Sequence, residues 1–140
     1  MIGEHFIRGW SKTQASITLS SAEAELVAMC KLAAEMIGIA SVAADFGTDT
    51  KIIMYADSSA AIAISKRRGS GKLRHINIGL LWIQEKVESE QLTVKNVKGI
   101  SNPADMMTKA VNKETLDKYM RMTKQKTAEG RARESLKVKR

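Results

Sequence analysis

Residues 52–68, IIMYADSSAAIAISKRR, contain the change of pattern on which the fold depends. The first five residues are rich in β-formers, and the apolar residues that follow recur at helical spacing: Ala60, Ala61 and Ile64. The stretch therefore predicts a strand followed directly by a helix, with Asp57 at the junction. Ligands bind at the carboxyl ends of strands in open α/β sheets, so Asp57 is a candidate functional residue. The alternative is that Asp57 only caps the helix.

Length and composition predict one domain with a core of its own. The chain has 140 residues, of which 44% are hydrophobic and 27% charged. It contains no run of 18 apolar residues and no secretory pattern at its start, and its single cysteine, Cys30, can form no internal disulfide. We therefore expect an intracellular protein, in the cytoplasm or nucleus, that is not secreted and has no membrane partner.

The positive charge is unevenly distributed. The net charge is +8, and residues 112–140 carry ten basic against four acidic side chains, whereas residues 1–111 carry thirteen against eleven. A basic tail, partly helical or disordered, favours a polyanionic partner such as nucleic acid, because cations neutralise phosphates. The alternative is a tail that charge merely keeps soluble.

The rest of the chain alternates between helical and strand patterns. In chain order we expect one or two strands in residues 6–19, a helix from Ser20 to about Gly47, a helix over 75–90, a strand over 92–97 and a short helix that begins at Pro103. Ser20 and Glu23 fit a capping box. Ile76, Leu80, Ile83 and Val87 form the inner stripe of the helix over 75–90. Trp82 lies off that stripe, where it either covers a neighbouring element or stacks on a base.

Three acidic side chains occupy similar positions at strand ends or helix starts. Glu25 lies in the first turns of the first helix, Asp57 follows a strand, and Asp105 lies in the first turn of the short helix. Carboxylates that share a site repel one another, and divalent cations such as Mg²⁺ or Mn²⁺ remove that penalty. Two such ions can activate a water and stabilise the leaving oxygen of a phosphodiester. For Glu25 alone, the alternative is a solvated first-turn glutamate.

A basic loop follows the helix after Asp57. Its cationic side chains surround Gly69 and Gly71, and they are Arg67, Arg68, Lys72, Arg74 and His75. Such a loop suits contact with phosphates, although it has no pattern typical of base recognition. The alternative is a charged loop that is only solvated.

Four ordered motifs resemble the ribonuclease H domain of a copia-type retrotransposon Pol polyprotein. They are SSAEAELVAMCKLAAE, YADSSAAIAI, KLRHINIGLLWIQEKVESEQL and VKGISNPADMMTKAV, and the resemblance covers residues 6–111. It implies an α/β fold with a mixed sheet and flanking helices, and hydrolysis of the RNA strand of RNA–DNA hybrids by two Mg²⁺ ions. By motif match, Glu25, Asp57 and Asp105 correspond to three of the family's four metal-binding acids, with Glu23 as the second choice for the glutamate.

The fourth acid of the family, an aspartate on the first strand, has no counterpart here. We therefore expect that the first two strands are missing, that residues 6–19 lack a neighbour to pair with, and that an edge is exposed. For this chain the resemblance then implies an impaired or inactive enzyme. One alternative is a non-catalytic nucleic-acid-binding remnant. The other is a fragment completed by a partner, either its missing N-terminal segment or another Pol chain.

Overall fold

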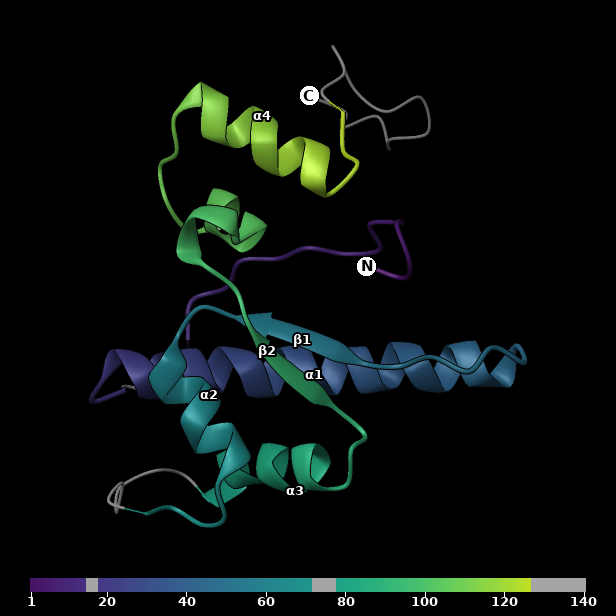
Figure 1. Cartoon of the computed structure of the whole chain (residues 1–140), viewed down its shortest axis with the longest axis vertical. Helices are drawn as coiled ribbons and strands as arrows, with labels where there is room; N and C mark the ends of the chain where they lie inside the picture. The colour runs from purple at the N-terminus through teal and green to yellow at the C-terminus, as the bar shows by residue number, and fades with distance from the viewer. Residues whose placement is uncertain (15–17, 72–77, 127–140) are drawn as a thin grey trace, which may run out of the picture. The chain divides into compact units, whose positions relative to one another are not determined.

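A computed structural model describes residues 1–14, 18–71 and 78–126 of the chain (Figure 1). The chain divides into two compact units. The larger unit is Lys12–Asn102, and the smaller unit combines Met1–Ser11 with Pro103–Arg140. This division reflects packing. The predicted domain of residues 6–111 and tail of residues 112–140 were defined by resemblance and charge, and they stay predictions.

The larger unit is built on two parallel strands, β1 (Ile53–Ala56) and β2 (Thr93–Asn96). Ile53 pairs with Thr93, and Ala56 with Asn96. Parallel neighbours require a crossover, which α2 (Ser59–Lys66), the 3₁₀ helix η1 (Ile78–Leu81) and α3 (Trp82–Glu88) supply. The class in the described residues is therefore mixed α/β, with four α-helices and a two-stranded parallel sheet. The strands predicted over residues 52–56 and 92–97 are both confirmed.

The long helix α1 (Ser21–Asp45) begins as its sequence predicts. Ser20 is the N-cap, and its hydroxyl accepts a hydrogen bond of 3.2 Å from the Glu23 N–H. The Glu23 carboxylate accepts a bond of 2.9 Å from the Leu19 N–H, one residue earlier than a standard capping box. The predicted cap residues, Ser20 and Glu23, are thus confirmed. The bond that Glu23 returns comes from the Leu19 N–H and not from the Ser20 N–H.

The end of α1 depends on a glycine. Gly47 adopts φ +75°, a conformation that favours glycine, and its N–H donates to the Ala44 carbonyl at 2.8 Å. The Thr48 N–H donates to the Ala43 carbonyl at 2.9 Å. These two bonds form a Schellman motif, which satisfies carbonyls that the helix leaves free. The predicted stop at Gly47 is confirmed.

The core of the larger unit lies between α1, the inner face of the sheet, α2 and α3. Its most deeply buried large side chains are Leu26, Met54, Ile83 and Leu92. Leu80, Trp82 and Val87 are partly buried and pack against this core. The predicted inner stripe is confirmed at Leu80, Ile83 and Val87, whereas Ile76 lies outside the described residues. Trp82 packs against the core, in agreement with the interpretation that it covers a neighbouring element.

The two halves of α1 differ. The buried residues of α1 lie between Glu23 and Ala33, whereas Val42 is 55% exposed. Length and composition alone would let α1 cross a membrane, a test that core helices of soluble proteins also pass. The first half is a core element, and the expected lack of a membrane partner stays a prediction.

The strands expected in residues 6–19 are a wrong prediction for the part of that stretch that the structure describes. Residues 6–14, 18 and 19 form no strand, and the nearest pairing is an isolated antiparallel bridge between Ile2 and His5. β-forming residues adopt a strand only when a neighbour supplies backbone partners, and no described strand pairs with this stretch.

The smaller unit contains the 3₁₀ helix η3 (Pro103–Met107) and α4 (Lys113–Met122). Pro103 opens η3, which confirms the predicted short helix, because proline suits a first helical position. The Asn112 side chain caps α4 by accepting a bond of 2.8 Å from the Thr115 N–H. The last residues of the predicted tail, 127–140, lie outside the described part.

Two truncations on the same helix test where the core lies. Leu26→Ala removes a side chain that is 0% exposed and should lower the free energy of unfolding by about 2–5 kcal/mol. Val42→Ala, on the exposed half of α1, should cost less than about 1 kcal/mol. Urea unfolding followed by circular dichroism measures both, and equal costs would contradict the proposed core.

Candidate functional site

Asp57 lies directly beyond the carboxyl end of β1, at the start of the crossover. The N-cap of α2 is Ser58, whose hydroxyl accepts a bond of 3.2 Å from the Ala61 N–H. Asp57 is half-buried and has no hydrogen bond or ion pair with any described residue. The interpretation of Asp57 as a helix cap is therefore wrong, because its neighbour fills that role. Its carboxylate is left for another use.

The carboxyl ends of both strands converge at Asp57. The Val97 N–H donates to the Ala56 carbonyl at 2.9 Å, so pairing continues to the last residue before Asp57. After β2 the chain forms the 3₁₀ helix η2 (Gly99–Ser101). A methyl group on Gly99 would lie 3.9 Å from Asp57 Oδ2. Asp57 thus lies at the carboxyl ends of the strands, where α/β proteins bind ligands.

The two glutamates of the first turns of α1 differ in exposure. Glu23 is 7% exposed, and its carboxylate accepts the Leu19 N–H as part of the helix cap. Glu25 is exposed. Solvent therefore reaches Glu25 more readily than Glu23, and the choice of Glu25 over Glu23 stays a prediction. Its role as a metal ligand stays a prediction.

Asp105 belongs to the smaller unit, in the first turn of η3. Its carboxylate pairs with Lys109 Nζ at 3.0 Å, and its side chain is 17% exposed. In the described residues of each unit, no group of three His, Cys, Asp or Glu side chains lies close enough to hold a metal ion. That Glu25, Asp57 and Asp105 share one metal site therefore stays a prediction.

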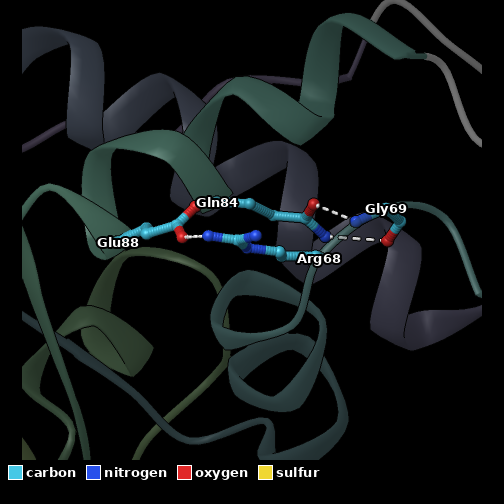
Figure 2. Close-up of polar contacts among 4 residues, drawn as sticks. All are labelled: Arg68, Gly69, Gln84 and Glu88. Carbon is cyan, nitrogen blue, oxygen red and sulfur yellow. Dashed lines mark hydrogen bonds and ion pairs between the residues drawn. The ribbon is translucent and has the colours of Figure 1, made fainter.

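The described part of the basic loop is tied to its own surroundings. A nitrogen of the Arg67 guanidinium donates to the Ser70 carbonyl, and Arg68 pairs with Glu88 of α3 (Figure 2). The hydrogen bond and negative charge of Glu88 raise the pKa of Arg68, which stays cationic. Lys72, Arg74 and His75 lie outside the described residues. Phosphate binding by the loop stays a prediction.

Gln84 anchors the start of this loop, a role that the sequence analysis missed. Its side-chain nitrogen donates to the Ile64 carbonyl at 2.9 Å and to the Gly69 carbonyl at 3.0 Å. Its oxygen accepts the Gly69 N–H at 2.9 Å (Figure 2). Gln84 is 8% exposed, so these bonds satisfy a buried amide. One feature of the sequence could have indicated this role. Gln84 directly follows Ile83 of the inner stripe, and a polar side chain so close to the core needs hydrogen-bond partners.

A groove of about 1110 Å³ lies at the other end of the strands. Its lining includes residues of α1, residues just before β1, residues before and at the start of β2, and Arg67, Arg68 and Glu88. Asp57 is not among its lining residues. The groove and the candidate metal ligand therefore occupy opposite ends of the sheet.

Cys30 offers no chemistry at neutral pH. Its thiol is buried in the core and donates to the Leu80 carbonyl at 3.2 Å. Burial raises the pKa of this thiol to about 11. The reactive thiolate is thus scarce near pH 7, which leaves Cys30 as a packing residue.

The Gln84 contacts generate a stability prediction. Gln84→Leu keeps the apolar volume but removes three hydrogen bonds, so it should lower the free energy of unfolding by about 1–3 kcal/mol. Gln91→Leu, at an exposed position, is the matched control and should change stability by less than about 0.5 kcal/mol. Urea unfolding measures both. Indistinguishable unfolding midpoints for the two variants would show that the three hydrogen bonds of Gln84 contribute nothing to stability.

Comparison with known proteins gives one informative similarity. No family model matches the chain, and no solved structure gives a significant match. Over 103 residues, 72% of this chain, the sequence is 37% identical to the retrovirus-related Pol polyprotein from transposon TNT 1-94 of Nicotiana tabacum. The matched part is only 8% of that relative's length. This similarity supports an origin of the chain in a retrotransposon Pol polyprotein.

Proposed function

We propose that the chain is the ribonuclease H region of a retrotransposon Pol polyprotein, and that its reaction is metal-dependent hydrolysis of the RNA strand of RNA–DNA hybrids. The similarity to a Pol polyprotein supports the retroelement origin. The observation that carries the proposal is the placement of Asp57. A half-buried carboxylate without a partner among the described residues lies at the carboxyl ends of two parallel strands.

In this proposal Asp57, Glu25 and Asp105 hold Mg²⁺ or Mn²⁺. Carboxylate oxygens are the ligands that these hard cations prefer, and they leave coordination positions for water and phosphate oxygens. The ions supply a water nucleophile and charge stabilisation for the leaving oxygen. Lys109 Nζ pairs with Asp105 Oδ1 at 3.0 Å, so a metal ion held by this carboxylate would compete with the ion pair.

The basic loop supplies the phosphate contacts in this proposal. Arg68 is 87% exposed at its side chain, so solvent and a phosphate group can reach it. Its pair with Glu88 is a surface ion pair, which water and salt screen. A phosphate can therefore displace Glu88 at little cost. Gln84 keeps the start of the loop in place while this exchange occurs.

Metal binding tests the role of Asp57. Asp57→Asn keeps the size of the side chain but removes its charge, so Mn²⁺ affinity should fall at least about tenfold. Any cleavage of a labelled RNA–DNA hybrid should be lost as well. Asp49→Asn, the same change at an exposed position before β1, is the control and should alter neither. Titration calorimetry with Mn²⁺ and a gel-based cleavage assay provide the two measurements.

The metal titration remains decisive even when the chain cuts slowly. Unchanged Mn²⁺ affinity in Asp57→Asn, or cleavage that survives this substitution, contradicts the proposed site. A loss of affinity in the Asp49→Asn control would place the metal elsewhere.

The net charge of +8 favours a second candidate function, nucleic-acid binding without catalysis. It predicts hybrid binding that weakens steeply with salt and does not change in Asp57→Asn or Asp105→Asn. Retention of hybrid binding without metal affinity would select this function over the first.

The loop contact has its own test by salt dependence. If Arg68 contacts one phosphate, Arg68→Gln should reduce the slope of log binding constant against log salt by about 0.9. Lys95→Gln, on β2, removes the same charge from an exposed strand position and should leave the slope unchanged. Fluorescence anisotropy with a labelled hybrid over a salt series gives both slopes. Equal slopes for Arg68→Gln and the unsubstituted chain would exclude the contact.

A further inference from the structure

The loop that follows α2 carries a serine that the proposed nuclease does not use. Residues 67–70 read Arg-Arg-Gly-Ser, and Arg67 and Arg68 are the only two adjacent arginines in the sequence. They stand three and two positions before Ser70, whose hydroxyl forms no hydrogen bond with a described residue. Many serine kinases select a serine by basic residues at these two positions, because acidic side chains line their substrate grooves. The stretch is thus a candidate modification site.

Solvent reaches this part of the loop. Arg68, Gly69 and Gly71 are exposed, the side chain of Arg68 to 87%, and Ser70 between the glycines is half-buried. Gly69 has φ +73° and Gly71 has φ +57°. Glycine changes from this conformation to an extended one at low cost, so the segment can straighten to enter a kinase groove. Straightening requires release of the hydrogen bonds between Gln84 and Gly69 (Figure 2).

Arg67 is placed to bind a phosphate on Ser70. Its guanidinium donates to the Ser70 carbonyl, and it lies so close to Gly71 that a Cβ there would come within 2.8 Å of Arg67 Nη1. Arg67 Nε is buried and has no acceptor among the described residues. A buried donor without an acceptor is uncommon and costs stability. A phosphate on Ser70 would bring three acceptor oxygens to this guanidinium.

We propose that Ser70 is phosphorylated by a serine kinase that recognises arginines, and that Arg67 then binds the phosphate. The kinase transfers the γ-phosphoryl group of ATP to Ser70 Oγ. The bond from the γ-phosphorus to the oxygen that leaves with ADP breaks, and the hydroxyl proton passes to the base of the kinase. The new phosphate accepts charge-assisted hydrogen bonds from Arg67. The site itself does not rest on the proposed nuclease function.

Phosphorylation changes the charge of the loop. Arg67 and Arg68 are the charged residues among residues 67–71, and a phosphate adds roughly −1.5 to −2 charges, so the sum falls close to zero. The consequence rests on the proposed function, in which Arg68 contacts a phosphate of the hybrid. A phosphorylated loop repels that backbone, so hybrid binding should weaken and depend less steeply on salt.

Phosphate transfer tests the site. A purified arginine-directed serine kinase with labelled ATP should modify the folded 140-residue chain, and mass spectrometry of the digested product should place the phosphate on Ser70. Ser70→Ala should abolish this incorporation, and Arg68→Gln should slow it at least about tenfold. Ser11→Ala, the same change at an exposed serine that has one arginine three positions before it, is the control and should leave the incorporation unchanged.

Phosphorus magnetic resonance tests the contact with Arg67. A guanidinium favours the doubly charged form of the phosphate, so pH titration should give a lower phosphate pKa in the folded phosphorylated chain than in the same chain unfolded in urea. Arg67→Lys, phosphorylated with excess kinase, keeps the charge but removes the Nε donor, and should lose most of this difference. Circular dichroism shows whether the variant is folded. If it is not, the comparison of the folded and unfolded unsubstituted chain decides.

Three results would overturn the inference. They are a chain that takes up no phosphate on Ser70 while a synthetic peptide of residues 62–74 does, incorporation that Ser70→Ala leaves intact, and an equal phosphate pKa in the folded and unfolded chain. Failure of the proposed function looks different. Phosphate on Ser70 that leaves hybrid binding unchanged would contradict the contact between the loop and the hybrid, and it would confirm the modification site.

Discussion

The parallel ladder between β1 and β2 is the constraint on which the larger unit depends. Two parallel neighbours cannot be joined by a tight turn, so the chain must cross over, and α2, η1 and α3 make that crossing. The same ladder brings the carboxyl ends of both strands to one end of the sheet, where Asp57 lies beside Gly99. It also directs Met54 and Val94 inward against α1 and its neighbours. Core and candidate site thus follow from one register.

The crossover is stabilised by contacts of different strength. Gln84 is buried and fully bonded, so removing it leaves carbonyls near the end of α2 without a partner. Arg68 and Glu88 form an exposed pair that water and salt screen. The first contact fixes where the loop begins, and the second can exchange partners. In the proposed function, a loop with a fixed start and an exchangeable cation, Arg68, can follow a mobile phosphate backbone.

Local patterns predicted the elements that local physics determines. The strands β1 and β2, the Ser20 cap, the Gly47 stop and the start of η3 at Pro103 all depend on neighbouring residues. The strands expected in residues 6–19 were wrong for the described part of that stretch, where no described strand supplies backbone partners. Gln84 was missed for a related reason, since its partners Ile64 and Gly69 are distant in sequence. Asp57 was placed correctly because it directly follows a strand, whereas a site that combines it with Asp105 requires tertiary structure.

Magnetic resonance with a paramagnetic ion tests the central claim, that Asp57 binds a divalent metal. Substoichiometric Mn²⁺, added to an isotope-labelled chain, broadens the amide signals of residues close to the ion, and Mg²⁺ serves as the diamagnetic control. The account predicts the strongest broadening at Asp57 and Gly99, accompanied by Asp105, and its reversal by excess Mg²⁺. Broadening centred on Asp49 or Glu88, with the Asp57 and Gly99 signals unaffected, would contradict it.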